Sequence, residues 1–218
     1  MSNDDEKTMQ LRRIYMKRAG LYDLLEKGSV FALEHKHKPE IKLRLRLCRP
    51  EDLENILALQ EQVYDAIEDK DTFVLSTWEE IAESLEKDTC IGAFDGELLV
   101  AFTLMVTYPE SERNLAKHLN YSAEKSAKCV TYDTTFVHPN YKGYGLQRVF
   151  IRLKDLIALN MGAVEALATV SPDNPHSLNN LQAGGFDVVK RKEMYSGVER
   201  LILRKKLSRR LRWERWKS

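Results

Sequence analysis

Residues 136–147, with the sequence FVHPNYKGYGLQ, have the residue types and spacing of a phosphate-binding turn. A strand-forming run ends where this segment starts, and a helix-forming run begins where it ends. The first backbone amides of a helix have no acceptor within the helix, and the helix dipole makes that end positive. Gly143 and Gly145 lack the β-carbon that would hold a diphosphate away from the backbone, and Lys142 and Arg148 can add positive charge.

A bound phosphate is not the only explanation of two glycines in such a turn. A helix that simply starts after a strand also uses glycine where the backbone needs a positive φ angle. The segment lacks the GxxxxGK(S/T) pattern of a P-loop and the third glycine of the GxGxxG dinucleotide fingerprint. The sequence therefore excludes these two motifs and leaves the ligand to be decided by the rest of the chain.

Two segments of the chain resemble the GNAT superfamily of N-acetyltransferases. Residues 137–146 look like the acetyl-CoA loop of that family, in the Gly-x-Gly-Leu-Gln form of a bacterial subgroup. Further on, Asn174, Ser177 and a Gly-Phe pair ending at Phe186 are similar to a second family motif, in which an asparagine after the fifth strand precedes a short helix. The two motifs occur in the family's order, and the resemblance covers residues 41–207.

The resemblance implies an α/β (α+β) GNAT fold. Such a fold is a mixed, twisted sheet of about six to seven strands with helices on both faces, and its fourth and fifth strands splay apart. In this chain those strands are expected at residues 128–137 and 163–170. Acetyl-CoA would be the acyl donor, and its pantetheine arm would lie in the gap between the two strands.

The same resemblance assigns individual residues to the cofactor. The backbone amides of residues 143–148 would hold the pyrophosphate, and the Val137 amide would face the thioester oxygen as an oxyanion donor. Asn174 would bind the pantetheine arm, with Ser177 close by. The implied acetyl-CoA contacts are Phe136, Val137, Lys142, Gly143, Tyr144, Gly145, Leu146, Gln147, Arg148, Asn174 and Ser177.

Three positions depart from the family pattern. Lys142 stands where the family prefers Arg or Gln, so it keeps the charge without the planar fork of arginine. Gln147 stands where Gly or Ala is usual, and it adds bulk near the phosphates. Leu181 occupies the position of the tyrosine that protonates the leaving thiolate in many members, so the usual general acid is missing.

Acyl transfer from a thioester to an amine needs a base for the ammonium group, a donor for the oxyanion and a proton for the thiolate. Asp133 is the best-placed carboxylate for the base, with Tyr132 beside it; the alternative is that Asp133 only hydrogen-bonds within the sheet. Tyr195 and Tyr144 are candidates for the missing acid, with structural or cofactor contacts as the alternative. Histidine is a common general acid or base, but His138 lies at a turn position where the family tolerates many residues.

Hydrophobic periodicity and turn residues predict the elements that would position these side chains. Asp95-Gly96 between two apolar runs is a strong hairpin signal. The expected helices begin at Pro50, at Ser76 or Thr77, at Gly145 and at Ser177. The expected strands are residues 41–48, 90–94, 97–108, 128–137, 163–170, 187–194 and 198–206.

The chain is expected to have three parts. Residues 1–40 form an N-terminal extension with an amphipathic helix that Gly28 ends, and residues 41–207 form the acyltransferase domain. Residues 208–218 form a basic tail that contains two tryptophans. In the domain, the acceptor site would be built by its first two helices, the loop of residues 109–128 and the turn of residues 194–198.

Composition is typical of a globular protein. Hydrophobic residues make up 43% and charged residues 31% of the 218 residues, and the formal net charge is +1, which favours no polyanionic partner. Three cysteines without a CxxC pattern argue against disulfides and zinc. With no signal-peptide core and no apolar stretch of membrane-spanning length, the prediction is a cytoplasmic protein without a metal or a membrane partner.

The predicted function is an acyl-CoA-dependent N-acyltransferase that moves acetyl from acetyl-CoA to a primary amine by direct attack. Two alternatives stay open. One is a non-catalytic acyl-CoA sensor, because Leu181 replaces the usual acid; the other is an RNA- or ribosome-associated protein that uses the arginines and tryptophans of residues 208–218. A packed terminal helix explains that tail as well, so nucleic acid is the less expected partner. The acceptor, the acyl length and a possible homodimer are left open.

Overall fold

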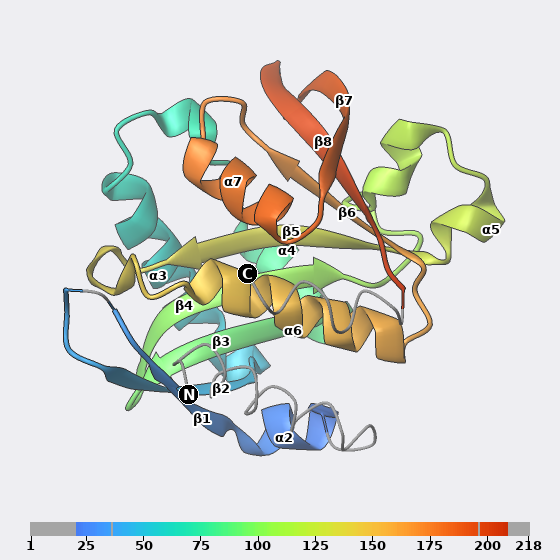
Figure 1. Ribbon diagram of the computed structural model, residues 1–218. Coiled ribbons are helices and arrows are strands. Elements are labelled where there is room, and N and C mark those ends of the chain that lie inside the picture. Colours follow the sequence, from blue (N-terminus) through green and yellow to red (C-terminus); the bar gives the residue numbers. More distant parts are fainter. Residues whose placement is uncertain (1–20, 36, 196, 209–218) are drawn as a thin grey trace.

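The computed structural model describes residues 21–35, 37–195 and 197–208, and an eight-stranded sheet forms its centre (Figure 1). The strand order is β1-β2-β3-β4-β5-β6-β8-β7. Neighbouring strands are antiparallel except for β5 and β6, which are parallel. The expected mixed sheet is therefore confirmed, with eight strands instead of about six to seven.

The elements lie close to their expected positions. The strands are β1 Ser29–Leu33, β2 Ile41–Leu47, β3 Thr89–Asp95, β4 Leu98–Val106, β5 Cys129–Val137, β6 Glu165–Val170, β7 Asp187–Met194 and β8 Val198–Lys206. The α-helices are α2 Leu21–Lys27, α3 Leu53–Asp65, α4 Trp78–Lys87, α5 Ala123–Ser126, α6 Leu146–Asn160 and α7 Pro175–Ala183. The short 3-10 helices are η1 Pro50–Asp52, η2 Lys70–Thr72, η3 Leu115–Leu119 and η4 Pro139–Tyr141.

β1 is the strand that the sequence pattern did not indicate. Phe31 and Leu33 are buried while Val30 is exposed, but a run of five residues is too short to separate a strand from a loop. β1 pairs with β2, so the sheet begins inside the expected N-terminal extension. The helix expected there ends at Lys27, directly before Gly28 with φ 76°. Its expected start, and residues 209–218 of the expected tail, lie outside the described residues.

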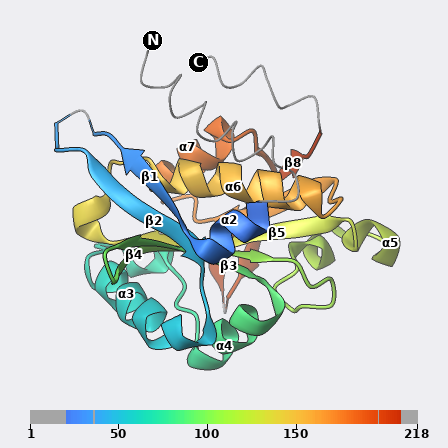
Figure 2. The same cartoon turned by 90° about the horizontal axis from the view of Figure 1, so that it is seen from below.

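Helices cover both faces of the sheet, with α3 and α4 on one face and α2, α6 and α7 on the other (Figure 2). Each face has its own apolar core. Phe150 is fully buried in the core beneath α6, and Phe102 is fully buried in the core beneath α3. Full burial of such a ring contributes roughly 1.5–3 kcal/mol. β5 contributes to both cores, with Tyr132 on the α6 side and Phe136 on the α3 side.

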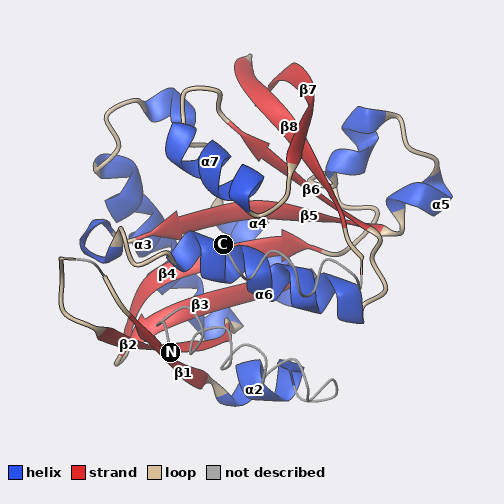
Figure 3. Cartoon of the chain, in the orientation of Figure 1, coloured by secondary structure: helices blue, strands red, loops and turns tan. Residues whose placement is uncertain are grey.

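β5 carries the irregularity that opens a site in the sheet. Tyr132 lies opposite Met105 and Thr135 lies opposite Thr103, so β5 has one residue more than β4 over this stretch. On its other edge, β5 pairs with β6 only from Cys129 to Tyr132. The two strands then part toward their C-terminal ends (Figure 3). The expected splay of these two strands is thus confirmed.

Candidate functional site

A cavity of about 130 Å³ lies where β5 and β6 part, with space for on the order of ten water-sized groups. Its walls come from β5, β6, β8, α6, α7, the α3–α4 connection and the β7–β8 turn. The residues considered from the sequence that line it are Tyr132, Asp133, Gln147, Asn174, Ser177, Leu181 and Tyr195. The cavity therefore brings together these sequence-selected residues, which are up to 63 positions apart in the chain, from Tyr132 to Tyr195.

The glycine-containing turn leads from η4 into α6 beside this cavity. Gly143 and Gly145 have φ angles of 94° and 74°, which glycine adopts without strain. The first backbone hydrogen bond of α6 runs from the Val149 amide to the Gly145 carbonyl, at 3.1 Å. The amides of Leu146 and Gln147 precede it and have no acceptor within the helix. The start of α6 thus has backbone amides without a helical acceptor, which the predicted anion site requires.

Hydrogen bonds from the turn to the end of β3 and to the β1–β2 connection hold the turn in place. The Tyr141 hydroxyl donates to Asp95 Oδ2 at 2.7 Å, and the Tyr144 hydroxyl donates to the Pro39 carbonyl at 2.8 Å. A β-carbon added at Gly143 would lie 2.6 Å from His35 Nε2, so a larger residue there would have to displace the His35 ring as well as adopt a φ angle of 94°. Tyr144 is buried with its hydroxyl engaged, and this arrangement favours a structural role over that of the missing acid.

Gln147 connects α6 to α7. Its Nε2 donates to Ser177 Oγ at 2.8 Å, and its Oε1 accepts from Asn180 Nδ2 at 2.7 Å. Asn174 caps α7, because its Oδ1 accepts from the Ser177 amide at 3.0 Å. The side chain that was expected to add bulk near the phosphates is thus tied to α7, which is why the chain tolerates it at this position.

The backbone of β5 turns the Val137 amide toward the gap. The His138 amide donates to the Val100 carbonyl of β4 at 2.9 Å. Successive amides in a strand point to opposite edges, so the amide of Val137 points away from β4. The Phe136 ring packs against Phe102 in the core beneath α3, with ring centroids 5.2 Å apart. By the same alternation the amide and carbonyl of Phe136 point toward β4, so neither the ring nor the backbone polar groups of Phe136 face the gap.

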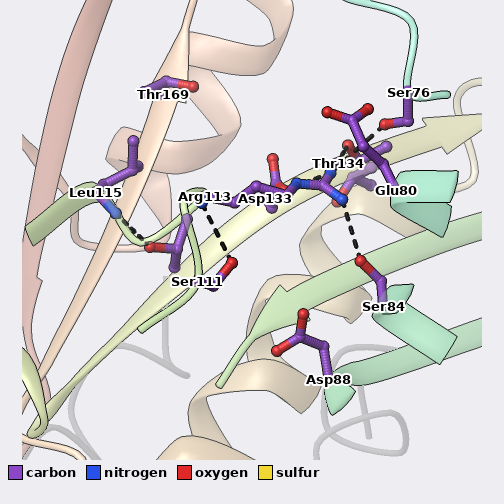
Figure 4. A network of polar contacts seen from close by, with 12 residues as sticks. Ser76, Glu80, Ser84, Asp88, Ser111, Arg113, Leu115, Asp133, Thr134 and Thr169 are labelled. Atoms are coloured by element: carbon purple, nitrogen blue, oxygen red, sulfur yellow. Dashed lines mark hydrogen bonds and ion pairs between the residues drawn. The ribbon is translucent and has the colours of Figure 1, made fainter. Parts of the chain in front are cut away.

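Asp133 forms an ion pair with Arg113, whose side chain enters from the β4–β5 connection (Figure 4). Arg113 Nη2 lies 2.5 Å from Asp133 Oδ2, and Nη1 donates to Ser84 Oγ at 3.1 Å. Oδ2 is buried and has no aligned hydrogen-bond donor among the described residues, so the contact is an ion pair alone. Burial raises the pKa of Asp133, while Arg113 and Lys154 oppose that rise. Asp133 is therefore a carboxylate with raised basicity in the cavity wall.

Lys154 is a second buried charge in this wall, and it was not identified from the sequence. It lies on α6, its side chain is almost fully buried, and its Nζ is 3.4 Å from Thr135 Oγ1. Burial lowers the pKa of Lys154 to about 7, against the opposing effect of Asp133. A lysine within a helical pattern is normally exposed, so its burial can be known only from the packing of α6 on β5. Lys154 can accept and release a proton near neutral pH.

Tyr132 is directed differently from its neighbour Asp133. Its hydroxyl donates to Asp155 Oδ1 at 2.8 Å, and Asp155 pairs with Lys205 at 2.5 Å. Burial first, then the charge of Asp155, raises the pKa of Tyr132. The hydroxyl therefore fixes α6 to the sheet, and Tyr132 reaches the cavity without a free proton donor or acceptor.

Two further residues close the far end of the cavity. Tyr195 lies in the β7–β8 turn with φ 51°, and its hydroxyl is 3.4 Å from Thr169 Oγ1 on β6. A left-handed backbone is uncommon for an aromatic residue and marks a conformation held by its surroundings. Arg200 of β8 lines the same end and is buried. Of these two, only Tyr195 could be selected from the sequence.

Neither a family model nor a curated protein matches this sequence. Solved structures do match its fold. The GNAT domain of S. lividans PAT has a TM-score of 0.60 and 15% identity over 83% of this chain and 97% of that chain. The ribosomal-protein-S18-alanine N-acetyltransferase from Escherichia coli has a TM-score of 0.57 and 13% identity over 75% of this chain and 93% of that chain.

A third structure, the PaiA N-acetyltransferase from Thermoplasma acidophilum in complex with coenzyme A, has a TM-score of 0.55. Its identity is 15% over 76% of this chain and 99% of that chain. The three likenesses identify the fold as that of the GNAT N-acetyltransferases. They confirm the resemblance inferred from the two sequence motifs at the level of the fold.

None of the helices in the described part of the chain has the length and apolar character needed to cross a membrane. Among the same residues, no three His, Cys, Asp or Glu side chains gather closely enough to hold a metal ion.

Replacing Lys154 by methionine should stabilise the protein by about 1–4 kcal/mol near pH 7. Because the pKa of Lys154 falls to about 7 on folding from 10.5, the unfolded chain binds more protons between these values. The destabilising effect of Lys154 is thus complete below pH 7 and fades as the pH rises toward 10.5. Urea unfolding from pH 7 to 9.5 should show a shrinking difference between Lys154→Met and the unmodified protein. Lys42→Met, at an exposed position of β2, is the control, and a pH-independent difference for Lys154→Met would contradict the assignment.

Proposed function

We propose that this chain is an acyl-CoA-dependent N-acyltransferase that transfers acetyl from acetyl-CoA to a primary amine by direct attack. The observation that carries the proposal is the opening between β5 and β6, where a backbone edge, the start of α6 and a buried carboxylate meet at one cavity. Structures with this fold include N-acetyltransferases, and one of them is in complex with coenzyme A. That likeness supports acetyl-CoA as the acyl donor.

The diphosphate of the cofactor would bind at the start of α6. The amides of residues 146–148 are directed out of the helix, and the positive end of its dipole lies behind them. The exposed side chains of Lys142 and Arg148 flank this end and add charge. The pantetheine arm would then run along the open edge of β5, next to Asn174 and Ser177, and bring the thioester to the cavity.

The residues around the cavity suit direct attack by an amine. Asp133 takes a proton from the amine, whose nitrogen attacks the thioester carbon. The Val137 amide donates to the oxyanion of the tetrahedral intermediate. When the carbon–sulfur bond breaks, Lys154 gives a proton to the thiolate, because its pKa near 7 lets it act at neutral pH. Lys154 then replaces the tyrosine that is absent at Leu181, which lines the same cavity.

We also infer that residues 41–207 carry this activity and that the protein works in the cytoplasm. The three cysteines, Cys48, Cys90 and Cys129, are all buried and free. Free thiols are typical of a reducing compartment. Burial raises the pKa of Cys90 to about 12, which makes it a poor nucleophile and supports direct attack without a covalent acyl-enzyme.

Coenzyme A and acetyl-CoA should protect the full chain against heat, and acetyl-CoA with a panel of primary amines should release free thiol. The release can be followed with a thiol-reactive dye, and the protection by a thermal melt. Protection by coenzyme A without turnover on any amine would instead support the acyl-CoA sensor. If coenzyme A gives no protection and acetyl-CoA gives no turnover, the proposal is overturned. The alternative to test is then RNA binding by the basic tail, of which residues 209–218 lie outside the described residues.

Gly145→Ala should weaken coenzyme A binding by roughly tenfold or more, since it perturbs charge-assisted hydrogen bonds worth about 1.5–3 kcal/mol. The matched control is Gly162→Ala, because Gly162 has a similar φ angle, 84° against 74°, but lies after the other end of α6. Both variants carry the same type of backbone strain. Isothermal titration with coenzyme A measures the difference, and equal affinities in the two variants would contradict a phosphate site at the start of α6.

Asp133→Asn should lower kcat by at least about 100-fold, the usual range for a general base, while heat protection by coenzyme A persists. Glu80→Gln is the control. Glu80 is a nearby carboxylate that acts on Asp133, and glutamine can keep its helix-capping contact with Thr77. We expect Glu80→Gln to change kcat by no more than a few-fold. An Asp133→Asn enzyme with an unchanged pH profile and kcat would exclude Asp133 as the base.

A further inference from the structure

Arg200 is a buried cation that has no acidic partner among the described residues. It lies on β8, it is 3% exposed, and its Nη1 has neither solvent contact nor a hydrogen-bond partner in that part of the chain. No carboxylate of the described residues forms an ion pair with it; Asp69 and Asp71 act on it only from a longer distance. Because an unpaired buried charge is strongly unfavourable, this guanidinium calls for an anion that the described residues do not supply.

The position of Arg200 points to the acceptor rather than to the cofactor. Arg200 lines the cavity, whereas Lys142 and Arg148 at the start of α6 do not. It lies beside the end of β6, since its neighbour Leu201 pairs with Val170. The proposed diphosphate site has its own amides and cations, so the Arg200 charge is not needed there.

The surroundings of Arg200 suit a small carboxylate. The guanidinium carbon is 5.7 Å from the centroid of the Tyr195 ring, and the Tyr195 hydroxyl lies near Thr169. Both hydroxyls can donate to an anion. Arginine binds carboxylates through two parallel hydrogen bonds, and its free Nη1 is available for one of them. The α3–α4 connection closes the wall with residues 72–74.

The same cavity also has a negative side chain, opposite in charge to Arg200. Asp133 lines it, and Tyr195 lies within electrostatic reach of both Asp133 and Arg200. The cavity therefore offers a negative group for an ammonium ion and a positive group for a carboxylate. A molecule that carries both an ammonium group and a carboxylate matches this pair of charges. A protein N-terminus or a lysine side chain has no free carboxylate beside its amine.

We propose that the acceptor is a free amino acid, or a similarly compact amine with a carboxylate, whose carboxylate pairs with Arg200 while its amino group lies against Asp133. This inference rests on the proposed N-acyltransferase activity, and it names the substrate class of the same cavity.

The test compares matched amines in the thiol-release assay with acetyl-CoA and the full chain. The panel contains glycine, alanine, methionine and glutamate, each beside its carboxamide and its decarboxylated amine. For at least one of the four amino acids, kcat/KM should be at least about 30-fold higher for the free acid than for its carboxamide. That factor corresponds to the lower end of the range for a buried, hydrogen-bonded charge pair.

Arg200→Met should remove this preference, with kcat/KM for the acid falling at least about 30-fold. Arg200→Lys keeps the charge without the fork, so it should restore part of the preference. The control is Arg191→Met on the adjacent strand β7, because Arg191 is exposed and pairs with Glu199 at 3.2 Å, away from the cavity. This control should keep the acid-to-carboxamide ratio of the unmodified protein.

A binding measurement separates this inference from the proposed activity. In the presence of saturating coenzyme A, a free amino acid should raise the melting temperature of the unmodified protein and of Arg191→Met, but not of Arg200→Met. Such Arg200-dependent protection without turnover would support the carboxylate site and overturn the catalysis. Turnover with equal rates for acids and carboxamides, or a preference that survives Arg200→Met, would overturn the carboxylate site and leave the activity standing. If the protein shows no turnover and no protection, both the carboxylate site and the proposed activity are overturned.

Discussion

The parting of β5 from β6 is the constraint on which the rest of this site depends. Where strands pair, the backbone amides of one strand donate hydrogen bonds to the carbonyls of the other. Beyond Tyr132 and Ala168, β5 and β6 no longer form these hydrogen bonds. The extra residue of β5 falls at the same place and directs Asp133 to Arg113, while Thr135 reaches Lys154. One local break in the sheet thus supplies a backbone edge, a carboxylate and access to a buried amine, and α6 and α7 enclose them.

The charges around this break are costly for stability, and their arrangement is consistent with function. Asp133, Lys154 and Arg200 line one cavity, and burial moves the pKa of each in the direction of its neutral form. A protein that needed only a stable core would fill this space with apolar side chains. The Tyr132–Asp155–Lys205 network, by contrast, pairs its groups fully and holds α6 on the sheet. Within the described part of the chain, the buried side-chain atoms without a hydrogen-bond partner, Asp133 Oδ2 and Arg200 Nη1, both belong to residues of the cavity wall.

Features that depend on neighbouring residues could be predicted from the sequence. Gly143 and Gly145 follow from the φ angles of a tight turn, and seven of the eight strands follow from apolar alternation and turn signals. The resemblance of two motifs to the GNAT family implies the role of Asn174 and identifies Leu181 as the position of the missing acid. The predicted fold came from these local patterns together with that resemblance.

Features that depend on long-range packing could not be predicted. Arg113 comes from a loop without periodicity, and Lys154 and Arg200 sit where helix and strand patterns place exposed charges. The contacts of Gln147 with α7 also arise only when the chain folds, and β1 is too short to be recognised alone. The residues that distinguish this site from a plain cofactor-binding turn are therefore those that the three-dimensional structure adds.

The most direct test of the central claim is the backbone amide spectrum of the isotope-labelled full chain during titration with coenzyme A. If the open start of α6 and the free edge of β5 bind the cofactor, the amides of Leu146, Gln147, Arg148 and Val137 should show the largest shifts. The amide of Gly162, after the opposite end of α6, should stay in place. Saturating coenzyme A that leaves residues 146–148 unmoved, or that shifts amides only elsewhere, would contradict this account of the site.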